Sequence, residues 1–283
     1  MNDGNTTLYG VLGHPIHHSF SPAIHTAAFE ETGINATYLA FDVADDQLEK
    51  AVDGLVTLDA KGWNLTMPHK TKMCGLCDEL SEAAAIVGAV NTVVNDHGHL
   101  TGHITDGAGF TAMLRARGFD VKGKRIVLFG AGGAARAVAV QLALDGAVSL
   151  SIFNRTLSHG ARLADLISAS TDCDARAFAL SDEKALAEQT AEADLLVNGT
   201  KLGMAPEPDT CVIADRALLK NKPVLADFVY NPLTTFFLKM GQDAGCLTFD
   251  GLGMLLWQGA LAFKLWTGQD MPVAAVRQRV FHQ

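Results

Sequence analysis

Two charged residues in the first 110 positions have the surroundings expected of an acid/base pair. Lys70 ends the segment NLTMPHK (64–70), directly after a proline that should terminate a strand. Ligands of open α/β proteins bind at the carboxyl ends of strands, and a lysine placed there can give or take a proton. Asp106 lies in LTGHITDGAGF (100–110), at the end of another apparent strand. Taken alone, this carboxylate could be a helix cap, a surface charge or half of an acid/base pair.

The segment HSFSP (18–22) adds two hydroxyl groups to these candidates. In an extended chain Ser19 and Ser21 point the same way, because side chains alternate with a period of two residues. Two neighbouring hydroxyl donors suit a carboxylate. The alternative is that Ser21 caps a helix ahead of Pro22, which leaves Ser19 able to bind a ligand.

A glycine-rich turn between an apolar strand and an Ala-rich helix predicts a phosphate-binding loop. The strand RIVLFG leads into GAGGAA (130–135), which matches the pattern G-x-G-x-x-G/A. The first glycine permits a tight turn, the second lets a pyrophosphate approach the backbone, and the small last residue lets helix and strand pack closely. The helix N-terminus supplies unpaired N–H groups and a partial positive charge. The residues expected to bind a dinucleotide are Gly130, Ala131, Gly132, Gly133 and Ala134.

The end of the following strand indicates which dinucleotide binds. An NAD site usually places an acid there, about 20 residues on, to accept hydrogen bonds from the ribose. This chain has Asn154, Arg155 and Thr156 at that point. A guanidinium binds a 2′-phosphate bidentately, whereas an acid would repel it. We therefore expect NADP, with a solvated surface arginine as the alternative interpretation.

The elements that carry these residues alternate between strand-like and helix-like segments, which predicts an α/β fold with two domains. Residues 1–106 plus 252–283 are expected to form a mostly parallel α/β domain that binds the substrate and carries out catalysis. Residues 107–251 are expected to form a doubly wound, Rossmann-type NADP domain, because 122–156 reads as one βαβ unit. The apolar helix that begins at Gly251 should return to the first domain.

Several local features follow from the same patterns. A hairpin should turn at Asp96, His97 and Gly98, because two strand-like runs flank them. A helix should begin at about His69, and a short helix should span 110–117. The glycines after Asp106 should mark a hinge between the domains.

Composition bounds the class of protein. The chain has 283 residues, of which 48% are hydrophobic and 19% charged, with a formal net charge of -9. This excludes disorder and makes nucleic-acid binding unfavourable, because phosphate neutralisation needs clustered Lys and Arg. No signal-peptide or membrane-spanning pattern is visible, and five cysteines suit reduced thiols, so we expect a cytoplasmic protein. Cys74 and Cys77 could be half a zinc site or a redox pair, but packing cysteines are favoured and no metal is expected.

Taken together, these motifs resemble the shikimate dehydrogenase family over about residues 8 to 270. The segments that carry the resemblance are GHPIHHSFSPAIH, NLTMPHK, GAVNT, TDGAGF, GAGGAARA, NRT, NGTKLGM, Tyr230-Asn231-Pro232 and GMLLWQGALAFKLWTG. The resemblance implies an oxidoreductase of the shikimate pathway of aromatic amino acid biosynthesis. Its expected activity is the reversible reduction of 3-dehydroshikimate to shikimate with NADPH, by a monomer or a homodimer acting on a small ring carboxylic acid.

The resemblance also implies roles for individual residues. Lys70 and Asp106 would form the catalytic pair, and Ser19 and Ser21 would bind the substrate carboxylate. The ring hydroxyls would be bound by Thr66, Asn91, Asp106 and Gln258, with Asn64 and Tyr230 nearby. The cofactor would lie on Gly130 to Ala134 with Asn154, Arg155 and Thr156 around its 2′-phosphate, and its nicotinamide end would be lined by Thr200, Phe228 and Gly251.

One departure from the family pattern bears on the substrate. Ile104 precedes Thr105 and Asp106 where the family usually has asparagine. Loss of a hydrogen bond in a closed site typically costs about 1–3 kcal/mol. Alternatives to shikimate are therefore quinate or aminoshikimate, or a non-catalytic protein that senses such a metabolite.

Overall fold

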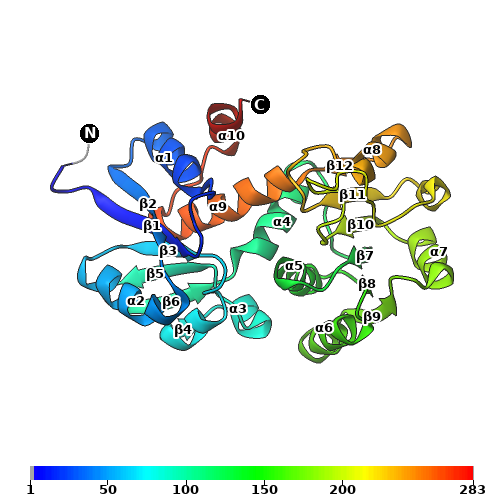
Figure 1. Ribbon diagram of the computed structural model, residues 1–283, viewed down its shortest axis with the longest axis horizontal. Helices are drawn as coiled ribbons and strands as arrows, with labels where there is room; N and C mark the ends of the chain where they lie inside the picture. The colour runs from blue at the N-terminus through cyan, green and yellow to red at the C-terminus, as the bar shows by residue number, and fades with distance from the viewer. Residues whose placement is uncertain (1–2, 283) are drawn as a thin grey trace. The chain divides into compact units, whose positions relative to one another are not determined.

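The computed structural model describes residues 3–282, which form two compact α/β units, each with a six-stranded sheet (Figure 1). The first unit comprises Met1–Thr105 and Leu256–Gln283, and the second comprises Asp106–Leu255. Two helices contain the boundaries, because α4 begins at Thr105 and α9 includes both Leu255 and Leu256. The predicted α/β fold class is confirmed.

The first unit contains a mixed sheet in the order β2-β1-β3-β5-β6-β4. The pairs β1–β2, β1–β3 and β4–β6 are parallel, whereas β3–β5 and β5–β6 are antiparallel. β3 is buried along its whole length, as expected of a central strand covered on both faces. The elements are β1 Thr7–Gly13, α1 Ser21–Thr32, β2 Ala36–Asp42, η1 Asp45–Gln47, α2 Leu48–Thr57, β3 Gly62–Leu65, η2 Lys72–Leu76, β4 Glu79–Leu80, α3 Glu82–Val87, β5 Thr92–Asp96, β6 His99–His103 and α10 Val273–Phe281.

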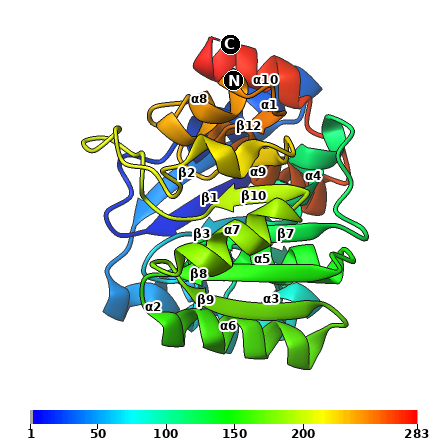
Figure 2. The same ribbon diagram turned by 90° about the vertical axis from the view of Figure 1, so that its right-hand side faces the viewer.

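The second unit contains a fully parallel sheet in the order β12-β11-β10-β7-β8-β9. Figure 2 shows β10, β7, β8 and β9 side by side in that order. The chain starts at β7, moves outward on one side and then crosses to β10, so the carboxyl ends of β7 and β10 form the switch point where such sheets bind ligands. The elements are α4 Thr105–Ala116, β7 Arg125–Phe129, α5 Gly133–Leu144, β8 Ser149–Asn154, α6 Leu157–Ser170, β9 Asp174–Ala179, α7 Glu183–Ala191, β10 Leu195–Asn198, η3 Arg216–Leu219, β11 Val224–Asp227, α8 Phe236–Asp243, β12 Thr248–Phe249 and α9 Gly251–Thr267.

The hairpin prediction is confirmed by the β5–β6 pairing. The turn residues His97 and Gly98 both have positive φ, of 52° and 94°. Such a turn matches the right-handed twist of the strands that it joins.

The predicted helix from His69 is wrong. Residues 67–71 form turns, and the helical segment that follows, η2, is a 3₁₀ helix. The carbonyl of Lys70 would accept from the N–H of Cys74 in an α-helix, but here it accepts from the N–H of Val90 at 2.8 Å. This long-range bond replaces the regular helical pattern.

The predicted start of the helix near Phe110 is also wrong, because α4 begins five residues earlier, at Thr105. Gly107 therefore lies inside a helix, directly after the boundary between the two units at Thr105 and Asp106. A Cβ atom on Gly107 would lie 2.4 Å from the carbonyl oxygen of Ala137 in α5. The glycine is needed for the close packing of α4 against α5.

No helix within residues 3–282 is long and apolar enough to cross a lipid bilayer.

Candidate active site

The two serines lie where the loop after β1 enters α1, with Ser19 in the loop. Ser21 is the first residue of α1, the N-cap is Phe20, and no side chain caps the helix. The alternative interpretation of Ser21 as a capping residue is therefore wrong. The N–H of Ser21 donates to Ser19 Oγ at 3.2 Å, so the backbone of one serine orients the side chain of the other.

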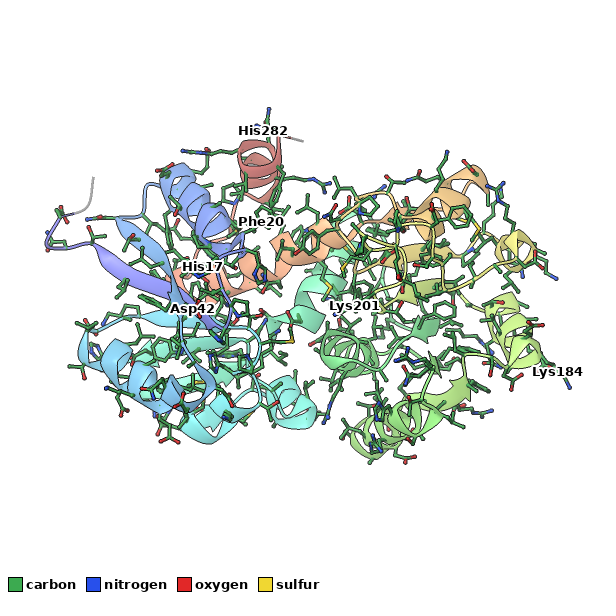
Figure 3. All side chains as sticks on the ribbon, in the orientation of Figure 1. His17, Phe20, Asp42, Lys184, Lys201 and His282 are labelled. Atoms are coloured by element: carbon green, nitrogen blue, oxygen red, sulfur yellow. The ribbon has the colours of Figure 1, made fainter. Side chains whose placement is uncertain are left out.

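Two histidines attach this loop to the end of β2. His14 Nδ1 lies 2.6 Å from Asp42 Oδ1, and His17 Nε2 lies 3.2 Å from Asp42 Oδ2. His17 and Asp42 are labelled in Figure 3. Both histidines are exposed, so these contacts contribute little stability, but they restrict the path of the loop that carries the serines.

A buried network of amides and hydroxyls lies behind the loop. Asn64 Nδ2 donates to the carbonyl of Asn91 at 3.0 Å and to Thr92 Oγ1 at 2.9 Å. Asn64 Oδ1 accepts from the Tyr38 hydroxyl at 2.7 Å. Because the carbonyl of Asn91 can only accept, the orientation of the Asn64 amide is fixed.

Asn91 connects this network to α4 and α9. Its Oδ1 accepts from the N–H of Thr105 at 2.8 Å, and its Nδ2 donates to Gln258 Oε1 at 3.5 Å. Thr105 begins α4, so the bond satisfies one of the N–H groups that a helix start leaves without a helical partner. Asp106 follows Thr105 directly in the chain. The Asn91 network therefore fixes the backbone from which Asp106 projects.

The Tyr38 ring packs between the network and a buried histidine. His25 stacks on Tyr38 with ring centroids 4.4 Å apart. Burial raises the pKa of Tyr38 well above its usual value, partly opposed by a hydrogen bond from Ser21. Burial also lowers the pKa of His25 to about 3, so this imidazole is neutral at ordinary pH.

Lys70 and Thr66 lie on the loop that follows β3. The N–H of Thr66 donates to the carbonyl of Leu12 at 3.0 Å, which extends the pairing with β1. His69 is fully buried, and its Nε2 donates to the carbonyl of Val43 at 2.8 Å. Together with the Val90–Lys70 backbone bond, these contacts fix the loop from Thr66 to Lys70.

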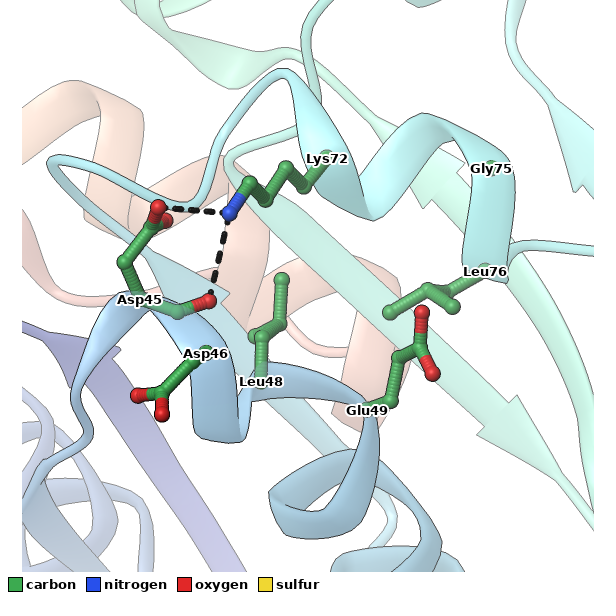
Figure 4. A pocket seen from close by; sticks show the side chains of 7 residues that line it. All are labelled: Asp45, Asp46, Leu48, Glu49, Lys72, Gly75 and Leu76. Carbon is green, nitrogen blue, oxygen red and sulfur yellow. Dashed lines mark hydrogen bonds and ion pairs between the residues drawn. The ribbon is translucent and has the colours of Figure 1, made fainter.

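A nearby surface pocket of the first unit does not suit an anionic substrate. It has a volume of about 460 Å³, and its charged lining consists of Asp45, Asp46, Glu49 and Lys72 (Figure 4). Lys72 Nζ is bonded to Asp45. The remaining acids leave the pocket negative, and they would repel a ring carboxylate.

The glycine-rich turn of the second unit has room for a diphosphate. Gly130 has a φ of +103°, which only glycine adopts readily, and a Cβ there would lie 2.9 Å from the carbonyl oxygen of Gly199. A Cβ on Gly132 or Gly133 would meet no atom within 4 Å. The turn therefore leaves open space at the N-terminus of α5, where the first N–H groups have no helical partner. These features fit a dinucleotide diphosphate.

The segment predicted to bind a 2′-phosphate joins β8 to α6. Asn154 Nδ2 donates to the carbonyl of Thr156 at 2.8 Å, which closes a short turn with Arg155 at its centre. Arg155 is exposed, and Thr156 is the N-cap of α6. A cationic side chain next to a helix N-terminus suits a phosphate group.

Two of the residues predicted to line the nicotinamide end, Thr200 and Phe228, follow β10 and β11, and the third, Gly251, follows β12 and begins α9. Thr200 Oγ1 donates to Asn198 Oδ1 at 2.7 Å. A Cβ on Gly251 would lie 2.2 Å from the carbonyl oxygen of Phe228, so only glycine permits this approach. Tyr230 follows β11 and is 42% exposed, which leaves much of its ring available for contact with a ligand.

One buried acid in this region is absent from the residues predicted from the sequence. Asp227 ends β11, is 1% exposed and accepts hydrogen bonds from Asn198 Nδ2, the N–H of Val229 and Thr235 Oγ1. Burial raises its pKa, opposed by these hydrogen bonds. The sequence signal is an acid inside the apolar run PVLADFVY.

The structure thus brings the predicted residues together in two sets, one in each unit. The first unit contains Ser19, Ser21, Asn64, Thr66, Lys70, Asn91 and Gln258, and the second contains Asp106, the glycine-rich turn, Asn154 to Thr156, Thr200, Phe228, Tyr230 and Gly251. No cluster of His, Cys, Asp or Glu within the described residues could hold a metal ion. All five cysteines, Cys74 and Cys77 included, are free thiols.

Three family models match the chain. Residues 11–93 match the shikimate dehydrogenase substrate binding domain, residues 113–206 match shikimate/quinate 5-dehydrogenase, and residues 251–281 match the shikimate 5′-dehydrogenase C-terminal domain. These matches include the serine loop, the glycine-rich turn and α9.

Similar proteins agree with these matches. A shikimate dehydrogenase (NADP⁺) of Alkaliphilus metalliredigens is 45% identical over 97% of this chain and 96% of its own. A quinate/shikimate dehydrogenase of Escherichia coli is 43% identical over 96% of this chain and 95% of its own. The crystal structure of shikimate 5-dehydrogenase from Listeria monocytogenes in complex with shikimate and NAD has a TM-score of 0.95 and 42% identity, and covers 98% of this chain and 97% of that one. Because these likenesses extend over nearly all of the sequence, the chain belongs to the shikimate dehydrogenase family.

Proposed function

We propose that this protein catalyses the reversible, NADP-dependent reduction of 3-dehydroshikimate to shikimate. The observation that carries the proposal is the network of Asn64, Asn91 and Gln258 beside the loop of Lys70. A polyhydroxylated ring needs several directional donors and acceptors at fixed positions, and a network of oriented amides provides them. Family membership supports the same activity.

Lys70 and Asp106 are proposed to act together as the acid/base pair. The bound cofactor supplies or takes up the hydride. Reduction of the ring ketone leaves an alkoxide, and the Lys70 ammonium donates the proton that this oxygen requires. In the reverse direction the neutral amine of Lys70 accepts the proton of the ring hydroxyl. Asp106 is proposed to orient the lysine and the ring hydroxyl for this proton transfer.

Ser19 and Ser21 are proposed to bind the ring carboxylate. Their hydroxyls are half-buried donors on a loop fixed by backbone and histidine contacts. Thr66, Asn64, Asn91 and Gln258 are proposed to bind the ring hydroxyls, and Tyr230 is proposed as a further substrate-binding residue.

The glycine-rich turn is proposed to bind the cofactor diphosphate, and Arg155 with Asn154 and Thr156 the 2′-phosphate. The absence of an acid at the end of β8 supports NADP. Thr200, Phe228 and Gly251 are proposed to line the nicotinamide end. All proposed residues come from one chain, so a monomer or a homodimer is sufficient, and the cysteine content suits the cytoplasm.

A second substrate is favoured by a specific observation. Ile104 is 5% exposed and directly precedes Thr105, so an apolar side chain is buried next to the residue that Asn91 binds. The relative in Escherichia coli is named a quinate/shikimate dehydrogenase. Quinate is therefore the second candidate, ahead of aminoshikimate and of a non-catalytic sensor role.

The test is an absorbance assay of nicotinamide reduction with shikimate, quinate and aminoshikimate, each with NADP and NAD. The proposal expects the highest kcat/KM for shikimate with NADP. Preference for quinate would select the second candidate. Tight binding of nucleotide and ring acid without turnover would overturn the proposed enzyme and support a sensor.

A further inference from the structure

Asp227 is a buried carboxylate whose hydrogen-bond donors are all neutral. Asn198 Nδ2 and the N–H of Val229 donate to Oδ1 at 3.0 and 2.9 Å, and the Thr235 hydroxyl donates to Oδ2 at 2.6 Å. Burial of a charge without a cationic partner is unfavourable, and such groups concentrate at functional sites. None of the roles proposed above uses this acid.

Asp227 holds together the two loops that follow β10 and β11. Asn198 and Asp227 are direct neighbours in the parallel register. Asn198 Nδ2 also donates to the carbonyl of Leu202 at 3.0 Å, and its Oδ1 accepts from the N–H and hydroxyl of Thr200. One carboxylate therefore orients the loop of Thr200 and, through the N–H of Val229, the loop after β11.

These loops adjoin the region proposed for the nicotinamide. The backbone of Gly199 and the methyl group of Thr200 pack against Gly130, the first glycine of the turn. Phe228, the next residue after Asp227, packs its carbonyl against Gly251. All of these residues belong to the second unit, so the arrangement is internal to it.

We propose that Asp227 is a positioning residue whose buried negative charge favours the oxidised cofactor over the reduced one. The inference rests on the proposed NADP-dependent function. An oxidised nicotinamide ring carries a positive charge and a reduced ring is neutral, so a fixed anion at this end of the sheet stabilises only the former. Opposite charges attract more strongly in the low dielectric of a protein interior than in water, so we expect the effect on affinity to be on the order of tenfold.

The test compares the affinities for NADP⁺ and NADPH, measured by calorimetry at pH 8 without ring acid. Asp227→Asn removes the charge. The oxygen of the new amide can still accept from Asn198 and Val229, and its nitrogen can donate to the Thr235 hydroxyl oxygen in place of the present bond. We expect NADP⁺ binding to weaken about tenfold more than NADPH binding. Equal weakening of both, or no change in either, would overturn the proposal.

Thr235→Val is the matched control, because it removes a donor to Asp227 and leaves the charge. It should reduce both affinities alike and leave their ratio unchanged; a ratio change as large as that of Asp227→Asn would contradict the role of charge. Asp227→Ser gives a second neutral variant with a smaller side chain. If neither neutral variant folds, Asp227 is required for the fold and the proposal is overturned.

Failure of the proposed function is distinguishable from failure of this inference. If the wild type binds both cofactors but oxidises none of the ring acids, the proposed activity is wrong while the affinity ratio still tests Asp227. If the wild type turns over shikimate and the ratio does not respond to Asp227→Asn, only the inference fails.

Discussion

A buried polar network lies around Asn91 in the first unit and another around Asp227 in the second, and the two differ in charge. The network around Asn91 in the first unit consists of amides and hydroxyls, namely those of Asn64, Thr92, Thr105 and Tyr38. The network around Asp227 in the second unit is organised by a carboxylate. A neutral network offers several donors and acceptors, and it can orient ring hydroxyls through directional hydrogen bonds. A buried charge acts over a longer distance, and it can distinguish ligands that differ in charge.

In a dehydrogenase the two networks suit different tasks, one at the ring acid and one at the cofactor. The ring acid differs from its ketone by two hydrogens, so shape and hydrogen bonding must position it. The cofactor changes its charge during the reaction, so electrostatics can bias it.

The largest effect is expected from Lys70→Ala, which removes the proposed proton donor beside the neutral network. Turnover with shikimate should fall by about 10²- to 10⁴-fold, because general acid/base catalysis contributes about that much. The affinity for NADP should remain the same. Steady-state kinetics and nucleotide titration provide both values.

Lys72→Ala is the matched control for this prediction, because Lys72 lies two residues after Lys70, is exposed and is paired with Asp45. Its turnover should equal that of the wild type. Full activity in Lys70→Ala would remove Lys70 from the proposed mechanism.

The neutral network itself is tested by Asn91→Ala. Removal of this side chain leaves the buried N–H of Thr105 without its acceptor, so the free energy of unfolding should fall by about 1–3 kcal/mol. The KM for the ring acid should also rise. Urea denaturation and kinetics measure the two effects.

Asn95→Ala separates stability from binding. Asn95 is buried and donates to the carbonyl of Ala60 at 2.7 Å, but none of its contacts belongs to the Asn91 network. The free energy of unfolding of Asn95→Ala should fall about as much as that of Asn91→Ala, while the KM for the ring acid should not change. An equal rise of KM in both variants would show that the network has no specific role in ring binding.

The cofactor side of the comparison is tested by Arg155→Gln. Loss of a charge-assisted bond to the 2′-phosphate should weaken NADP about 10- to 100-fold, since such bonds contribute about 1.5–3 kcal/mol. NAD affinity should stay constant. The control is Arg162→Gln, because Arg162 is an exposed residue within α6. If Arg155→Gln changed the affinities for NADP and NAD by the same factor, the assignment of Arg155 to the 2′-phosphate would be wrong.

The smallest effect on activity is expected at His25, behind the neutral network. Its folded pKa of about 3 lies below the ordinary value of 6.5, so between these pH values the unfolded chain binds a proton that the folded chain does not. Stability should therefore fall on acidification below about 6.5, by up to about 1.4 kcal/mol per pH unit. His25→Phe keeps an aromatic ring against Tyr38 and should reduce this slope in denaturation curves measured from pH 7 to 4. An unchanged slope would show that other groups dominate.

The sequence predicts features that depend on local order along the chain. The glycine-rich turn, the hairpin at His97 and Gly98, and the parallel strands follow from short patterns of turn residues and apolar runs. The structure agrees with these predictions because each depends on backbone conformation within a few residues. The expected roles of the site residues come instead from the resemblance to the family, and they remain predictions.

Features that depend on distant contacts could not be predicted. The start of α4 was misplaced because the cap of its first turn comes from Asn91, 14 residues earlier. The segment after His69 is irregular because Val90 binds the carbonyl of Lys70. Asp227 gave only a weak signal, since an acid within an apolar strand shows its role only when Asn198 and Thr235 lie beside it.

The central claim is that the chain transfers a hydride between the ring acid and the nicotinamide. It is tested most directly with shikimate that carries deuterium on the ring carbon whose hydroxyl becomes the ketone. The wild type with NADP⁺ should form NADPH that carries the deuterium, with a slower rate than for unlabelled shikimate if hydride transfer limits turnover. Unlabelled NADPH, or none at all despite binding of both ligands, would contradict the account.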